Sequence, residues 1–217
     1  MAIKIIQRIP LSVLVMLCFS VSLSVFRVAA TGSAMYLFLN WNLFLATIPW
    51  LLSEWILRHK SRISPVMLWI SLVTWLLFFP NCPYILTDLF HLKKSYAMPL
   101  WYDLILILSY AWTALIIGFS SWRKIEQVLI AQWGRSTTGI ITFFVFLSAG
   151  FGVYLGRYLR WNTWDILYNP SLLWSDISHR LVAPSEHPYT WGLTLLLGIF
   201  LHLMYSTLKQ FRSEIRI

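Results

Sequence analysis

A short polar segment follows a proline-broken apolar stretch, and its side chains could do chemistry. Pro80 and Pro83 interrupt the apolar run, and Tyr84, Asp88 and His91 come directly after them. If this segment is helical, the i, i+4, i+7 spacing places these three side chains on one face. Ionisable groups on irregular backbone indicate a functional site here, because at membrane depth both survive only inside protein or beside a wet cavity. An Asp–His pair could bind a divalent metal ion or work as a general base with its orienting carboxylate.

Further polar residues stand at the ends of other apolar runs and complete a candidate site. Two arginines in this group could hold a phosphate or carboxylate of a substrate. We expect one pocket at the outer face, closed below by Asn40, on which the following residues converge: Tyr84, Asp88, His91, Asp103, Arg157, Arg160 and Asp165. The residues assigned to catalysis are Asp88, His91 and Asp103, and those assigned to substrate binding are Asn40, Asn42, Tyr84, Arg157, Arg160, Asn162 and Asp165.

A structural interpretation of the same residues stays open. Asn40 would be an interhelical hydrogen-bond partner and Asn42 a hydrated residue at the interface. Asp103 falls in the first turn of an expected helix, where a carboxylate is favoured by the helix dipole. The charged residues could equally form an ion-pair network that fixes the outer loops, since such networks resemble sites.

The composition is typical of an integral membrane protein. Of the 217 residues, 59% are hydrophobic and only 12% are charged, more apolar than a soluble domain of this length requires. We expect a single helical-bundle domain over residues 1–217. The net charge of +9 does not indicate nucleic-acid binding, because Lys and Arg lie in short segments between apolar runs. Cys18 and Cys82 form neither a metal-type pair nor a disulfide framework.

The apolar runs predict an all-α, polytopic membrane protein with about six transmembrane helices. The first run could also be a signal peptide, but its length favours an uncleaved anchor, whose Arg27 can reach the interface. Residues 122–138 are expected to form a loop that contains a short interfacial helix, and the leucine spacing around 173–181 predicts a helix on the surface. The expected spans cover about 9–30, 35–57, 64–79 (broken by the prolines), 99–120, 139–159 and 189–208.

The basic residues predict the orientation of these spans. With the N-terminus inside, 11 of the 17 Lys and Arg residues are cytoplasmic, which favours cytoplasmic N- and C-termini in the cell membrane. Most acidic residues then lie on the outer side, so we expect no comparable polar cluster at the cytoplasmic ends. The 11 residues are Lys4, Arg8, Arg58, Lys60, Arg62, Arg123, Lys124, Arg135, Lys209, Arg212 and Arg216.

Ser148, Gly152 and Gly156 stand four residues apart in the fifth expected span. Small residues at this spacing form a ridge that another helix can approach closely. We expect this ridge to make a helix–helix contact, and it could also serve a partner protein.

Several motifs, taken together, carry a resemblance to a known family. They are Asn40-Trp41-Asn42, Phe79-Pro80-Asn81-x-Pro83-Tyr84-x-x-Thr87-Asp88-Leu89-x-His91-Leu92, Tyr102-Asp103 and Tyr154-Leu155-Gly156-Arg157-x-x-Arg160-x-Asn162-x-Trp164-Asp165. With these motifs the chain resembles the uncharacterised bacterial membrane family called domain of unknown function 1361. The resemblance implies a multi-pass membrane protein of unassigned activity and supplies no mechanism.

Three functions remain open, because the chain contains none of the common hydrolase, metalloprotease or phosphate-loop motifs. The leading hypothesis is a membrane-embedded enzyme acting on a lipid-linked or small anionic substrate at the extracytoplasmic face. A small transporter is the second hypothesis, since proline-broken spans line solute paths, although the few spans and the absence of a repeat argue against it. The third is a scaffold whose polar cluster is a stabilising network.

Overall fold

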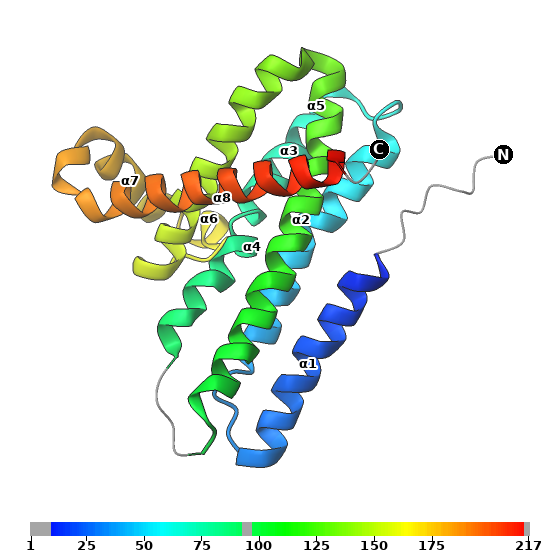
Figure 1. Ribbon diagram of the computed structural model, residues 1–217. Coiled ribbons are helices and arrows are strands. Elements are labelled where there is room, and N and C mark those ends of the chain that lie inside the picture. The colour runs from blue at the N-terminus through cyan, green and yellow to red at the C-terminus, as the bar shows by residue number, and fades with distance from the viewer. Residues whose placement is uncertain (1–9, 93–96, 215–217) are drawn as a thin grey trace.

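The protein is built from helices, shown in Figure 1 in a computed structural model that describes residues 10–92 and 97–214. No strand occurs in these residues, so the expected all-α class is confirmed. The elements are α1 (Leu11–Thr31), α2 (Phe38–His59), α3 (Pro65–Phe78), α4 (Asn81–Tyr84), the 3₁₀ helix η1 (Ile85–His91), α5 (Leu100–Tyr158), α6 (Asp165–Tyr168), α7 (Pro170–Val182), the 3₁₀ turn η2 (Pro184–Glu186) and α8 (Pro188–Glu214).

Four helices in the described chain are long and apolar enough to cross a membrane. They are Leu11–Thr31, Pro65–His91, Leu100–Tyr158 and Pro188–Phe211. The second comprises α3, α4 and η1, so the expected proline-broken span is present as one apolar unit. The third contains two of the expected spans, while α2 is not among the four. A membrane protein is therefore confirmed, and the count of six spans stays a prediction.

The α5 helix is too long to be one straight span. Its 59 residues would extend about 89 Å at 1.5 Å per residue, three times the hydrocarbon thickness. The chain instead reverses at Gly134, whose φ of 80° and ψ of 172° only glycine adopts readily. Figure 1 shows the two limbs of α5 running up to this turn and back. Residues 100–133 are called the first limb below, and residues 135–158 the second limb.

The expected loop at residues 122–138 is wrong, because this stretch is helical apart from the turn at Gly134. Trp122 is 1% exposed and packs against Trp75 of α3 at 5.6 Å between ring centroids. Its neighbour Ser121 accepts a 2.7 Å hydrogen bond from the indole of Trp75. Burial of these side chains between helices stabilises the helical conformation. In the sequence alone, the charged residues of this stretch favour a loop.

Two of those charged residues, Lys124 and Glu126, are paired with other helices. Lys124 lies 2.6 Å from Glu54 of α2, and both side chains are at most 9% exposed. Glu126 lies 2.6 Å from Lys209 of α8. Ion pairs therefore tie α2, α5 and α8 together at the end of the bundle where α2 finishes. The expectation that this end carries no comparable polar cluster is wrong.

The proline-broken segment is held between the two limbs of α5 by close contacts at glycines. A Cβ atom on Gly118 of the first limb would lie 2.7 Å from Cβ of Cys82. A Cβ atom on Gly152 of the second limb would lie 2.5 Å from Cγ of Pro80. Larger residues at either position would push the limbs apart, so these glycines allow the break to sit inside the bundle.

Candidate functional site

A buried ion pair joins the broken segment to the end of α5. Nη2 of Arg157 donates to Oδ1 of Asp88, and the two side chains are 12% and 1% exposed. Nδ2 of Asn42 on α2 donates to the other carboxylate oxygen at 2.9 Å. Both oxygens of this buried carboxylate are therefore satisfied, and one interaction network connects α2, η1 and α5.

The remaining nitrogens of Arg157 also have partners. Nε donates to Oγ1 of Thr87 at 2.8 Å, and Nη1 lies 2.8 Å from Nε2 of His91. The guanidinium carbon lies 4.3 Å from the centroid of the Tyr84 ring, a cation–π contact. Because arginine only donates, we assign the lone pair of His91 to Nε2 and its proton to Nδ1. We call this group the Arg157 cluster: Asn42, Tyr84, Thr87, Asp88, His91 and Arg157.

Asn40 faces a different part of the bundle from Asn42. Its Nδ2 donates to the hydroxyl of Ser24 at 3.2 Å, and its Oδ1 accepts from the hydroxyl of Tyr110 at 2.7 Å. These bonds connect α1, α2 and α5, as the structural interpretation of Asn40 requires. Two residues apart on a helix is a rotation of about 200°, so only one of these asparagines reaches the cluster.

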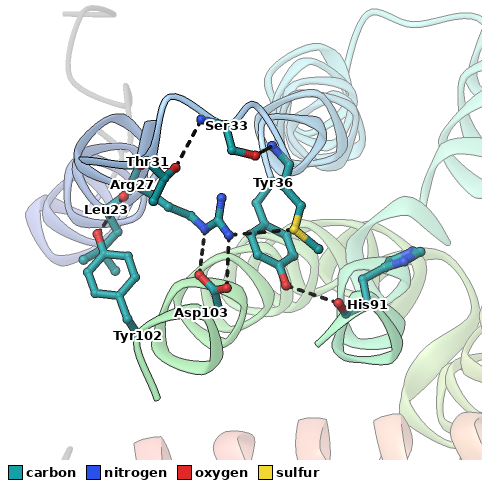
Figure 2. Close-up of polar contacts among 9 residues, drawn as sticks. Leu23, Arg27, Thr31, Ser33, Tyr36, His91, Tyr102 and Asp103 are labelled. Carbon is teal, nitrogen blue, oxygen red and sulfur yellow. Dashed lines mark hydrogen bonds and ion pairs between the residues drawn. The ribbon is translucent and has the colours of Figure 1, made fainter. Parts of the chain in front are cut away.

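Asp103 forms a second buried ion pair, with Arg27 of α1 (Figure 2). Nε of Arg27 donates at 2.7 Å and Nη2 at 3.2 Å to the two carboxylate oxygens. Arg27 is 2% exposed, so the expectation that it reaches the membrane interface is wrong. The guanidinium lies 4.6 Å from the ring centroid of Tyr36, whose hydroxyl donates to the carbonyl of His91 at 3.1 Å. Tyr36 therefore links this pair to the backbone of the Arg157 cluster.

The three residues beyond α5 do not join the cluster. Helix α5 ends at Tyr158, and Arg160 follows with a φ of 62° and an exposed side chain. Arg160 has no ion pair with any described residue. The backbone N–H of Asn162 donates to Asp165 at 2.7 Å, and the Asn162 side chain donates to the same oxygen at 3.3 Å. The expected clamp of two arginines is thus not assembled.

A cavity of about 340 Å³ lies beside the cluster. Its walls come from α2, α3, α4, the second limb of α5, the segment 161–166 and α7. The lining is mainly apolar and includes three tryptophans. Asn42 and Tyr84 belong both to this lining and to the Arg157 cluster. The polar lining residues are Asn42, Asn81, Tyr84, Ser148, Asn162 and Thr163, and the tryptophans are Trp41, Trp161 and Trp164.

Helix α7 supplies one wall of the cavity, which sequence reasoning missed. Leu173 and Ile177 line the cavity, whereas Leu181, the next residue in the same spacing, is 53% exposed. The recurrence of apolar residues every four positions correctly predicted a helix. In the first two turns of α7, the face that carries these residues covers the cavity. The indole of Trp161 donates to Asp176 at 2.7 Å and ties α7 to the adjoining segment.

The small-residue ridge on α5 is occupied by the chain itself. A Cβ atom on Gly156 would lie 3.0 Å from the Tyr84 ring, and one on Gly152 would meet Pro80. Ser148 lines the cavity. A partner protein at this ridge stays a prediction.

The arrangement disfavours a metal ion at Asp88 and His91. Arg157 already contacts one oxygen of that carboxylate and the lone-pair nitrogen of that imidazole. A divalent cation between the same atoms would have to displace a permanent positive charge. The structure therefore suits an arginine-bridged pair better than a metal-ligand pair.

The helical architecture, the apolar spans and the buried ion pairs define an all-α membrane protein. The chain belongs to the family described as "Protein of unknown function (DUF1361)", which matches residues 41–204. This confirms the resemblance found in the sequence. The matched region contains the Arg157 cluster and the cavity, whereas Arg27 precedes it. No curated protein and no solved structure matches the chain, so function has to be argued from the site.

Proposed function

We propose that the chain binds an amphipathic, lipid-type molecule in the cavity, and that it is an enzyme acting on the polar group of that molecule. The observation that carries the proposal is the lining of the cavity. Its volume of about 340 Å³ falls in the range of roughly 300–1,000 Å³ that is usual for ligand sites. Apolar walls with a few polar side chains suit acyl or isoprenoid chains attached to a polar group.

The residues shared by the cavity and the cluster support an action on the polar group. Asn42 and Tyr84 line the cavity, and each also contacts the Asp88–Arg157 pair. A polar group bound to these two side chains would lie next to the buried charges. His91 is exposed, so it is the acid–base candidate, whereas the buried Asp88 acts by positioning Arg157. For Nε2 of His91 to accept a proton, its hydrogen bond with Arg157 has to open.

Photo-crosslinking tests the binding part. The full chain in nanodiscs, with a phospholipid that carries a photoreactive acyl chain, should be labelled on α2 around Trp41 and on α7 around Leu173. Labelling confined to outward-facing positions such as Val15 and Val25 of α1, which are 56% and 59% exposed, would contradict a cavity ligand.

Comparative lipid analysis tests the enzyme part. Membranes of cells that express the chain should differ in lipid composition from membranes with the His91→Gln variant, which keeps a hydrogen-bond acceptor for Arg157. If the two compositions are the same while crosslinking is intact, the protein binds lipid without converting it. In that case the Arg157 cluster is a stabilising network, which is the alternative function. The complete pairing of Arg157 supports this alternative.

The proposal includes an orientation in a bacterial inner membrane with both termini cytoplasmic. The support is the basic-residue count together with the fold, which brings the end of α2 and the turn at Gly134 to the same end of the bundle (Figure 1). Reporter fusions at His59 and Gly134 should read as cytoplasmic, and a fusion at Ala97 should read as external. An external reading at His59 would reverse the orientation.

A further inference from the structure

Three potential metal ligands converge where α7 meets α8. His179 lies in the last turn of α7, Glu186 lies in η2, and His187 precedes Pro188 at the start of α8. One ligand atom from each residue lies within 4.8 Å of the others. Nδ1 of His179 and Nε2 of His187 are 2.7 Å apart. None of the three belongs to the Arg157 cluster or lines the cavity.

Backbone hydrogen bonds form the turn between α7 and α8 that carries these ligands. The N–H of Ala183 donates to His179 at 3.0 Å and closes the end of α7. The N–H groups of Glu186 and His187 then donate to Ala183 and Pro184, each at 3.1 Å. The turn that carries two of the three ligands is therefore formed by its own hydrogen bonds. Little reorganisation is needed for the ligands to meet one ion.

The donor set and its spacing suit a transition-metal ion. Two imidazoles whose nitrogens face one another need a proton between them, or an ion that accepts both lone pairs. Tetrahedral Zn²⁺ with bonds of about 2.05 Å places its nitrogen ligands about 3.3 Å apart, so an opening of about 0.6 Å admits the ion. Two histidines and one glutamate also form a known zinc ligand set that leaves a fourth position to water.

Accessibility supports the same conclusion. His179 and Glu186 are exposed and His187 is half-buried, so an ion from solution reaches the ligands without crossing the apolar core. The nearest basic side chain along α7, Arg180, is bonded to the side chain of Asp176 at 3.2 Å. Its charge is thus partly compensated by a carboxylate on its own helix.

We propose that His179, Glu186 and His187 form a binding site for a divalent transition-metal ion of the Zn²⁺ type, with an open fourth position. Metal binding fastens the end of α7 to the start of α8. Because α7 forms one wall of the cavity, the ion fixes the position of that wall. The proposal does not depend on what the cavity binds.

The test uses the full, tag-free chain in detergent, stripped of metal by a chelator and titrated with Zn²⁺ alone against a chromophoric competitor. The parent should bind one Zn²⁺ per chain in a saturable way. His179→Ala and His187→Ala should each weaken binding by more than about tenfold, and Glu186→Gln should weaken it while keeping side-chain size. The matched control is His59→Ala, an exposed histidine at the end of α2, which should leave the affinity unchanged.

Hydrogen exchange separates a site from nonspecific binding. Zn²⁺ should slow the exchange of amides between residues 179 and 190 in the parent and have no effect there in His187→Ala. Because the ligands are mainly exposed, the metal-free variants should melt at the temperature of the parent. Absence of saturable binding by the parent, full affinity in both histidine variants, or an equal loss in His59→Ala would each overturn the proposal.

Discussion

Nε2 of His91 accepts a 2.8 Å hydrogen bond from Nη1 of Arg157. A guanidinium has no acceptor atom, so we assign the accepting lone pair of the imidazole to Nε2 and the ring proton to Nδ1. The same guanidinium binds the buried Asp88. His91 is therefore positioned by the arginine of the Asp88–Arg157 ion pair. Any acid–base role of His91 is coupled to the position of Arg157.

The tautomer of His91 is directly measurable. Nitrogen NMR of the chain labelled at histidine should show His91 protonated on Nδ1 at neutral pH, because Nε2 faces a permanent donor. In Arg157→Met the fixed tautomer should give way to a mixture. A proton on Nε2 in the parent would show that Arg157 does not bind this ring.

Removing Arg157 should destabilise the fold. Arg157→Met leaves the Asp88 carboxylate buried without its partner, which costs about 3–5 kcal/mol of unfolding free energy. Arg160→Met is the matched control: the side chain is exposed and has no ion pair in the described chain, so its effect should stay within about 0.5 kcal/mol. Unfolding in detergent measures both. Equal effects of the two variants would mean that the buried pair contributes nothing.

The Arg27–Asp103 pair should behave as one unit. Arg27→Met and Asp103→Leu should each destabilise by about 3–5 kcal/mol, since each leaves one charge stranded among buried side chains. The double variant should be more stable than either single variant, because it leaves no unpaired charge. A double-mutant cycle of unfolding free energies measures this coupling, and strictly additive losses would argue against the pair.

At the small-residue ridge of α5, one added methyl group should lower stability only where the chain packs closely. Gly152→Ala places Cβ 2.5 Å from Cγ of Pro80, so the limb of α5 has to move away, at a cost of about 1–3 kcal/mol. Gly192→Ala is the control on α8, where an added Cβ meets no atom within 4 Å. It should be neutral or slightly stabilising, because alanine is the better helix former. Similar melting temperatures for both variants would mean that Gly152 faces open space.

Local patterns in the sequence identified much of this architecture. The prolines at 80 and 83 located the broken span, and the spacing of Asp88 and His91 predicted that their side chains share a face. Both side chains contact Arg157. Long-range pairing was not visible. The sequence predicts an interfacial position for Arg27, because nothing in a single sequence reveals that Asp103, 76 positions away, lies opposite it. A charge in an apolar run has to find a partner, but the partner depends on the packing of the helices.

The loop assignment at residues 122–138 failed for a related reason. Lys124 and Glu126 read as solvent-exposed residues, whereas both are buried against charges on other helices. The cavity wall from α7 was equally hidden, since Leu173 and Ile177 mark an apolar face without saying what it covers. The spacing of apolar residues predicts a helix and its apolar face. Only the three-dimensional structure shows which residues pack against that face.

The proposed lipid-type molecule in the cavity can be detected directly. Native mass spectrometry of the full chain, released from nanodiscs, can count the lipids that stay bound. Ser148→Trp fills the cavity from the second limb of α5, and Ser136→Trp adds the same side chain at an exposed position of that limb. We predict a retained lipid in the parent and in Ser136→Trp, and its loss in Ser148→Trp. Equal retention in both variants, or no retained lipid in the parent, would contradict the account.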